Sequence, residues 1–173
     1  KGLFVRFDKQ INNFNTQLMD FTKKSEFHFF YCLPMGEEMY LFESTYYTSL
    51  RKDKQEMTDE VHEYIKQRYG NEYSVVREEY GEIPLTTKVK INKKNSNYIN
   101  IGIPSGATRA STGYTFLNIQ KQIDEYIKKL NGDTYIEYSD TFRSRVLRKM
   151  DNVLLQIIKD HPMTSKNILY RMF

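Results

Sequence analysis

The hydrophobic pattern of this chain changes its period near Asn97. Before that point, apolar and aromatic residues mostly alternate with polar ones, which is typical of half-buried strands. After it, apolar residues recur every three or four positions, which is typical of amphipathic helices. The order therefore predicts an antiparallel sheet followed by a helical C-terminal half.

The first part of the chain contains several predicted strands and one helix. Turn residues around Gly36 join the runs Phe27–Leu33 and Met39–Tyr47 into an antiparallel hairpin. A helix begins near Asp53, which forms a capping box with Glu56, and it ends at Gly70-Asn71. The remaining predicted strands are Gly2–Phe7, the short piece Gln17–Phe21, and Glu72–Leu85.

The second part predicts three helices. The first begins at Phe116 and ends at Asn131-Gly132. A long helix runs from Ser139 and closes before Pro162, and a short last helix is capped at Thr164 or Ser165. Because an apolar stripe at this spacing usually faces a core, we interpret these stripes as core positions.

A loop rich in small residues, Gly102–Phe116, follows a predicted strand at Asn97–Ile101 and opens into the first of these helices. Backbone N–H groups and the positive end of a helix dipole suit a phosphate or an electron-rich ring. The spacing alone favours an ordinary strand–turn–helix corner. It is not a phosphate-binding Walker loop, because the lysine is missing and the glycine interval differs.

Composition limits the possible classes. Cys32, the single cysteine, excludes an internal disulfide and fits a reducing compartment. The three histidines are widely spaced, so we expect no metal site. A net charge of +4, spread along the 173 residues, gives no reason to expect a nucleic-acid partner. The densest basic cluster, Lys88–Lys94, is interpreted as a solvated edge strand and turn, with contact to anionic lipid as the alternative.

No apolar run is long enough to span a bilayer, and the N-terminus does not resemble a signal peptide. We therefore expect a cytoplasmic chain, either free or peripheral on a membrane. Lys1 stands where a natural start would place methionine, so we also expect a fragment of a longer protein.

Glu43 is the candidate for chemistry. Alternation along the second hairpin strand places it on one face with Met39, Leu41, Thr45 and Tyr47. Removing a carboxyl group from water raises its pKa, which would let it deliver a proton near neutral pH. The alternative is a solvated edge-strand glutamate. The surrounding aromatic residues could line a pocket for an apolar ligand and stabilise a cation held there. Alternatively, they could simply pack in the core.

Five short motifs occur in order along nearly the whole chain: Leu18–Phe21, Phe29–Pro34, Leu41–Thr45, Arg77–Gly81 with Ile83-Pro84, and Ser111–Phe116. In this order they resemble the lycopene β-cyclases of the flavoprotein lycopene cyclase family. Each motif alone is weak, whereas five in the same order make a chance match improbable.

The resemblance implies an α/β flavoprotein with a Rossmann-type FAD-binding domain. The part that aligns is C-terminal and lacks the N-terminal glycine-rich dinucleotide fingerprint, so this chain by itself is expected to be α+β. The resemblance divides the chain into a substrate-binding sheet region (1–97), a strand–loop–helix that completes the FAD-binding domain (98–131) and a C-terminal helical region (132–173).

The resemblance also implies a reaction. Family members close the linear ends of lycopene into β-rings as intramolecular lyases, with a reduced FAD that is required but not consumed. Glu43 matches the glutamate that protonates the terminal alkene, and the FAD contacts match Gly106, Thr112 and Gly113. Ser44 stands where several members have a second acid, which leaves the proton acceptor open. The implied partners are an apolar carotenoid and a membrane surface.

Two departures weaken the match of the loop: Ser105-Gly106 replaces paired glycines, and Ala110 replaces a usual proline. The alternatives are therefore another FAD-dependent enzyme, such as an aromatic hydroxylase or a prenyl-chain reductase, and a non-catalytic module that binds an apolar ligand or a membrane. Oxidation of a nicotinamide cofactor would indicate the first, and apolar-ligand binding without flavin would indicate the second.

We predict that residues 1–173 alone bind FAD weakly or not at all and show no cyclase activity. One helix N-terminus contributes on the order of 1 kcal/mol towards an anion, far less than tight cofactor binding requires. Titration calorimetry of the isolated chain with FAD tests this, and micromolar or tighter affinity would contradict it.

Overall fold

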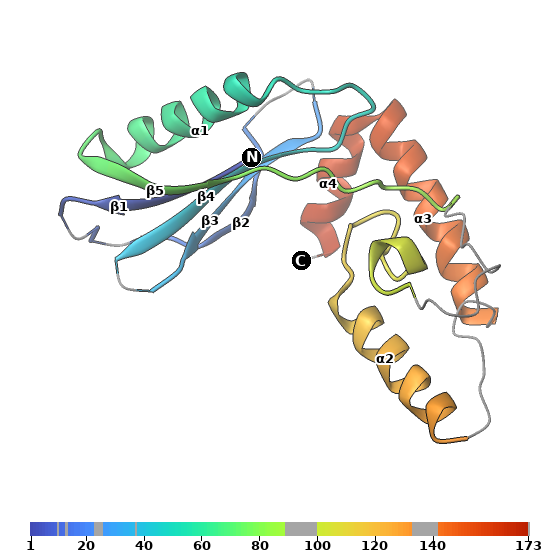
Figure 1. The fold of residues 1–173 in the computed structure, drawn as a ribbon. Helices are drawn as coiled ribbons and strands as arrows, with labels where there is room; N and C mark the ends of the chain where they lie inside the picture. Colours follow the sequence, from blue (N-terminus) through green and yellow to red (C-terminus); the bar gives the residue numbers. More distant parts are fainter. Residues whose placement is uncertain are drawn as a thin grey trace. The chain divides into compact units, whose positions relative to one another are not determined.

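The computed structural model describes residues 1–9, 11–12, 14–22, 26–36, 38–88, 100–132 and 142–172. These residues form an α+β fold of five strands, four α-helices and one short 3-10 helix, shown in Figure 1. The strands are β1 (Gly2–Phe7), β2 (Gln17–Asp20), β3 (His28–Pro34), β4 (Met39–Tyr46) and β5 (Tyr73–Glu79). The helices are α1 (Lys54–Tyr69), η1 (Ile103–Ser105), α2 (Phe116–Leu130), α3 (Phe142–Asp160) and α4 (Pro162–Met172).

The described residues belong to two compact units. The sheet unit comprises Lys1–Glu82 with Ile158–Phe173, and the loop unit comprises Ile83–Ile157. The sheet unit contains the five strands, which are paired antiparallel in the order β2-β3-β4-β1-β5, together with α1 and α4. The loop unit contains η1, α2 and most of α3.

The predicted hairpin is confirmed. β3 pairs with β4 from His28↔Tyr46 to Pro34↔Tyr40. The turn is closed by the Met39 amide, which donates to the Gly36 carbonyl, and Gly36 has a φ of 81° that glycine adopts without a steric penalty. β1 pairs with the other edge of β4, so β4 is flanked by a strand on each side.

The two faces of the sheet differ. We call the face that bears Phe30, Phe42 and Ser44 the α1 face, because α1 covers it (Figure 1). We call the opposite face, which bears Phe29, Leu41 and Glu43, the Glu43 face. The buried residues between the sheet and α1 form the main core: Leu3, Val5, Phe7, Phe30, Cys32, Phe42, Val61, Tyr64 and Ile65.

The predicted start and end of α1 are confirmed. The Asp53 carboxylate accepts hydrogen bonds from the amides of Gln55 at 2.8 Å and Glu56 at 3.1 Å, which satisfies two donors that a helix start leaves open. Gly70 closes the helix with a φ of 91°, and its amide donates to the Lys66 carbonyl.

Three predicted boundaries were wrong or lie outside the described residues. β5 ends at Glu79 rather than Leu85, since Gly81 and Pro84 both disfavour a continuing ladder. α4 begins at Pro162 rather than at Thr164 or Ser165, because proline suits the first turn of a helix. Most of the predicted strand at Asn97–Ile101 lies outside the described residues, and Asn100 and Ile101 are not in a strand.

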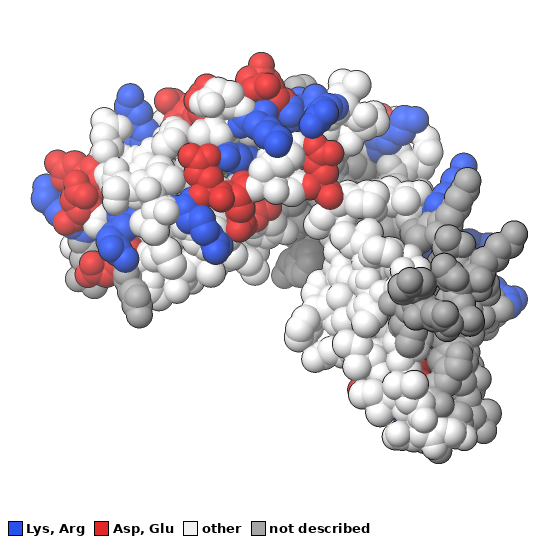
Figure 2. Space-filling model, viewed as in Figure 1, with Lys and Arg blue, Asp and Glu red and all other residues white. Residues whose placement is uncertain are grey.

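The interpretation of the α3 stripe as core was wrong at Val146, Met150 and Val153, which are exposed, and the interpretation of the α2 stripe as core was also wrong. Its period is helical, as predicted, yet Phe116, Ile123, Ile127 and Leu130 are exposed. Figure 2 shows that most of the visible surface over α2 carries no charged side chain. Periodicity fixes which side of a helix is apolar, whereas burial needs a partner element. No helix in the described part of the chain is both long enough and apolar enough to cross a membrane.

We predict that Asp53→Ala lowers the free energy of unfolding by about 1 kcal/mol, because two amides of the first turn lose their acceptor. Denaturant titration followed by circular dichroism measures the change. Asp59→Ala, an exposed substitution in the middle of the same helix, is the matched control and should shift stability by less than about 0.5 kcal/mol. Equal losses for both variants would show that the cap is not the cause.

Candidate functional site

Glu43 lies in the middle of β4, between β1 and β3. Its cross-strand neighbours are Gly2 on one side and Tyr31 on the other. It is half-buried, and its Oε1 atom accepts a hydrogen bond of 2.9 Å from the Thr45 hydroxyl. Glu43 therefore does not occupy an edge strand, which removes one of the two alternatives that the sequence left open.

An aromatic layer continues from Glu43 along the same face of the sheet. Phe29 is 1% exposed and Phe27 is 2% exposed, so these rings are shielded by their neighbours. The Phe29 ring lies 5.1 Å from Tyr31, and the Phe27 ring lies 5.0 Å from Tyr47. Phe21 contacts both phenylalanines at 5.4 and 5.5 Å. Such a layer excludes water, and the half-buried rings of Tyr31 and Tyr47 offer faces that attract a cation.

The tyrosines of this layer keep their protons at neutral pH. Burial raises the pKa of Tyr47 to about 12, with Tyr31 as a second cause. Burial also raises the pKa of Tyr31, and the neighbouring Glu43 carboxylate adds to that shift. These phenols can donate hydrogen bonds and offer ring faces, but they do not act as bases near neutral pH.

Ser44 points to the opposite face and belongs to a buried polar cluster that joins the sheet to α1. Its hydroxyl lies 2.9 Å from His28 Nε2 and donates to Glu60 Oε2 at 3.2 Å. The Tyr46 hydroxyl donates to both oxygens of Glu60, at 2.7 and 2.9 Å. Burial, followed by the hydrogen bond to Glu60, raises the pKa of Tyr46. Ser44 therefore cannot receive a proton from a substrate on the Glu43 face.

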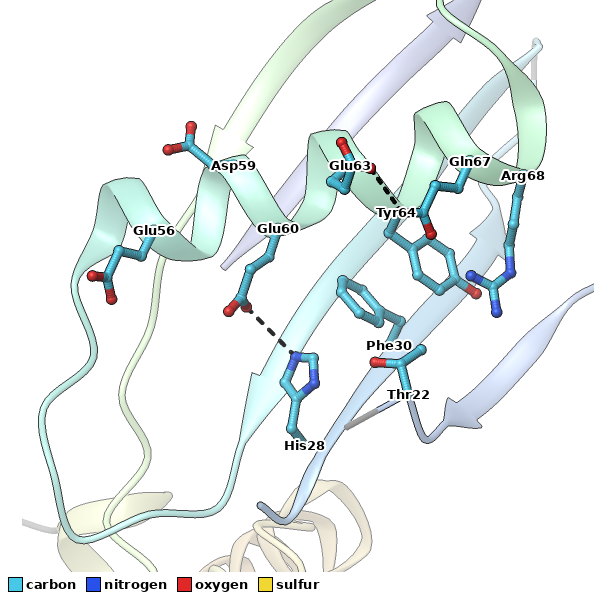
Figure 3. Close-up of a pocket in the computed structure, with 10 residues that line it drawn as sticks. All are labelled: Thr22, His28, Phe30, Glu56, Asp59, Glu60, Glu63, Tyr64, Gln67 and Arg68. Carbon is cyan, nitrogen blue, oxygen red and sulfur yellow. Dashed lines mark hydrogen bonds and ion pairs between the residues drawn. The ribbon is translucent and has the colours of Figure 1, made fainter. Parts of the chain in front are cut away.

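This cluster resembles a serine–histidine–acid triad in composition but not in geometry. A triad needs the serine and the acid at different ring nitrogens of the histidine. Here Ser44 Oγ and Glu60 Oε2 both approach His28 Nε2, the second at 3.7 Å. Figure 3 shows Glu60 reaching from α1 to His28 of β3. We therefore assign the cluster to the attachment of α1. No local sequence pattern indicates this cluster, because its members come from three separate elements of the chain.

A groove of about 590 Å³ opens beside this cluster on the α1 face (Figure 3). Four carboxylates of α1 line it, with Arg68 and the Tyr64 ring at one end. The four carboxylates make this lining unsuited to an apolar ligand. The lining residues are Thr22, His28, Phe30, Glu56, Asp59, Glu60, Glu63, Tyr64, Gln67 and Arg68.

Cys32 is not a nucleophile in this fold. It is fully buried in the core, where its thiol donates to the Tyr64 hydroxyl at 3.2 Å. Burial raises the pKa of Cys32 to about 11, so the thiolate is scarce near neutral pH. Among the described residues, no group of histidine, cysteine and acidic side chains could hold a metal ion.

The Gly102–Phe116 loop is held by its own hydrogen bonds. The amide of Gly106 donates to the Ile103 carbonyl at 3.0 Å. The amides of Thr112 and Gly113 both donate to the Arg109 carbonyl, at 3.3 and 2.8 Å. The three residues that the family resemblance assigns to FAD contact thus have amides that are already bonded within the loop.

A buried carboxylate fastens this loop to α3. Asp151 Oδ1 accepts hydrogen bonds of 2.7 Å from the Arg109 guanidinium and from the Ser111 hydroxyl. Asp151 is 5% exposed, so the ion pair with Arg109 is shielded from water. Sequence analysis missed this clamp, since Asp151 lies about forty residues from its partners.

The predicted cofactor residues differ in their access to a ligand, because a Cβ atom at Gly113 would already meet Leu85 Cδ2 at 3.6 Å and Ile83 at 3.8 Å. Gly106 and Gly113 have φ values of 75° and 72°, which glycine adopts readily, and neither presents a side chain. Thr112 is exposed. The first turn of α2 follows at once and carries the positive end of the helix dipole. The approach left open to a ring or a phosphate is therefore at the exposed Gly106, at Thr112 and at the first turn of α2, rather than at the three loop amides.

Comparison with known proteins gives one match. A family model described as "Lycopene cyclase protein" matches residues 1–164. Searches of the curated proteins and of the solved structures gave no match.

We predict that Asp151→Asn loosens the loop. Asparagine removes the negative charge that holds Arg109. Because a hydrogen bond to a charged group typically contributes 1.5–3 kcal/mol, hydrogen exchange of the Thr112 and Gly113 amides should accelerate about tenfold or more. Hydrogen exchange read by mass spectrometry measures this. Asp124→Asn, an exposed change on α2, should leave the exchange as it is. Unchanged protection in Asp151→Asn would mean that the clamp does not hold the loop.

Proposed function

The chain belongs to the lycopene cyclase family, and we propose that it takes part in closing the linear ends of lycopene into β-rings, with Glu43 as the general acid. The reaction is an isomerisation, an intramolecular lyase step without net electron transfer. The family match to residues 1–164 supports action on a carotenoid. The surroundings of Glu43 support the assignment of the acid.

One observation carries the assignment: Glu43 is a half-buried carboxyl group beside an aromatic layer, in the central part of a sheet. Protonation of an alkene needs an acid that is held against an apolar substrate, away from bulk water. Leu41, Phe29 and Tyr31 supply the apolar surroundings on the same face. The acidic groove on the α1 face lacks that character.

The proposed steps begin with proton transfer from Glu43 to the terminal double bond. The resulting tertiary cation is attacked by the neighbouring alkene, which closes the ring and moves the positive charge to a ring carbon. The faces of the aromatic residues stabilise these cations, and their packing excludes the water that would capture them. Loss of a ring proton completes the β-ring.

We further propose that reduced FAD lies against the loop at Gly106, Thr112 and Gly113, next to the first turn of α2. When bound, it would supply an electron-rich ring system able to stabilise a cation, without being oxidised. We propose three successive regions: residues 1–97 bind the substrate, residues 98–131 complete the FAD site, and residues 132–173 form the helical region. The exposed apolar side chains of α2 are compatible with a peripheral membrane location.

We predict that Glu43→Gln abolishes most of the cyclisation while folding and flavin binding survive. Glutamine keeps the size of the side chain but has no acidic proton, and loss of a positioned proton donor costs about 100- to 10,000-fold in rate. The measurement is β-ring product from lycopene with reduced flavin, made by the full-length protein. Thermal unfolding of each variant verifies the fold.

Glu38→Gln is the matched control, because Glu38 lies exposed in the turn before β4 and should be dispensable. A Glu43→Gln variant with most of the original rate would place the proton donor elsewhere. Stoichiometric oxidation of a nicotinamide cofactor by the original protein would instead indicate a hydroxylase or a reductase.

A further inference from the structure

Two glutamates and a glycine form one row across three strands. Gly2 of β1 is in register with Glu43 of β4 on one side and with Glu79 of β5 on the other. Residues directly opposite each other in antiparallel strands point to the same face, so Glu79 belongs to the Glu43 face. Because neighbouring strands lie about 4.8 Å apart, the Cα atoms of the two glutamates are about 10 Å apart.

The glycine between them leaves space above the sheet, and Glu79 extends into that space. A Cβ atom at Gly2 would lie 2.9 Å from Glu79 Cγ and 3.2 Å from Glu79 Oε1. The Glu79 side chain therefore leans from the edge strand over Gly2, towards Glu43. Leu41 Cδ1, at 3.1 Å from the same position, adds an apolar wall.

Arg77 gives Glu79 an environment that Glu43 lacks. Its guanidinium lies 3.4 Å from Glu79 Oε2 and 3.8 Å from the centre of the Phe4 ring, so it is held against the sheet. Glu43, in contrast, accepts its hydrogen bond from the neutral Thr45 hydroxyl. Two carboxyl groups of one site in different environments are the usual arrangement for separate acid and base roles.

The other candidates for a base are excluded by their positions or their protonation. Ser44 points to the α1 face, and Tyr31 and Tyr47 remain protonated because their pKa values are raised. Glu78 is in register with the core residue Leu3, so it points away from Glu43, and it is bonded to Lys1 Nζ. On the described strands, Glu79 is the carboxylate that shares a face with Glu43.

We infer that Glu79 is the base that removes the ring proton in the proposed cyclisation, an inference that rests on the proposed function. In this step a C–H bond next to the cationic ring carbon breaks. Its electron pair forms the ring double bond and neutralises the cation, and the proton passes to the Glu79 carboxylate. Exchange with water then restores the carboxylate of Glu79 and the proton of Glu43, so no oxidant or reductant is consumed.

The geometry suits two proton transfers at different carbons. The carbon that gains a proton and the carbon that loses one belong to the same ring but are not the same atom. Because the Glu79 side chain fills the space directly over Gly2, an end group would lie on top of this row, with the Glu43 and Glu79 carboxyl groups beneath it. One carboxyl group could serve both steps only if the ring turned between them, while a cation was exposed.

The test is Glu79→Gln in the full-length protein, with lycopene and reduced flavin in D₂O. β-ring formation should fall about 100-fold or more. Glu43 should still protonate the alkene, so the cation should form. It should then either revert to lycopene, which leaves deuterium in the recovered lycopene, or be captured by water, which gives a hydroxylated end group. Glu79→Asp should retain β-rings as the main product at a reduced rate. Glu78→Gln, the adjacent exposed glutamate on the other face, should keep both rate and product.

The outcomes separate the two proposals. β-rings at the original rate from Glu79→Gln would overturn the inference and leave the role of Glu43 intact. A folded, flavin-binding Glu79→Gln variant that gives neither product nor deuterium exchange would also overturn it, because protonation itself would then need Glu79. If the original protein leaves lycopene unchanged, the proposed function itself is contradicted, and with it the inference that rests on it.

Discussion

The two-sided pairing of β4 is the constraint on which the site depends. Hydrogen bonds to β1 and β3 fix the strand, and its pleat sends successive side chains to opposite faces. Glu43 therefore faces the aromatic layer, while Ser44, the next residue, is hydrogen-bonded to His28 and Glu60 beneath α1. A slip of one residue would exchange these surroundings, so the ladder determines the chemistry available to each residue.

The aromatic residues of the sheet serve two purposes on its two faces. On the α1 face, the Phe30 ring stacks on Tyr64 of α1 at 4.1 Å, which is core packing. On the Glu43 face, Phe27 and Phe29 pack against each other and against further rings, beside a carboxyl group. The sequence could not separate these purposes, because both faces use the same residue types. The pairing register separates them.

Local features of the fold could be predicted from the sequence, whereas features made by distant residues could not. The hairpin, the Asp53 cap and the period of α2 each depend on a few neighbouring residues, and all three were confirmed. The exposure of the α2 stripe was not foreseen, since burial depends on a partner. The Asp151 clamp and the approach of Glu79 to Gly2 join residues about forty or more positions apart, and no local pattern carries that information.

A cyclisation that begins and ends with a proton needs an acid and a base that do not neutralise each other. Glu43 and Glu79 belong to strands that are separated by β1, so Gly2 keeps their backbones two strands apart. Arg77 gives one of them a hydrogen-bonded positive partner, whereas the other accepts its hydrogen bond from the neutral Thr45 hydroxyl. In the proposed mechanism, the register across three strands places both carboxyl groups on one face of the sheet. Two acids adjacent in sequence could not lie on one face, because adjacent residues of a strand face opposite sides. The position after Glu43 is therefore free to be a serine, and its hydroxyl is used to hold α1 instead.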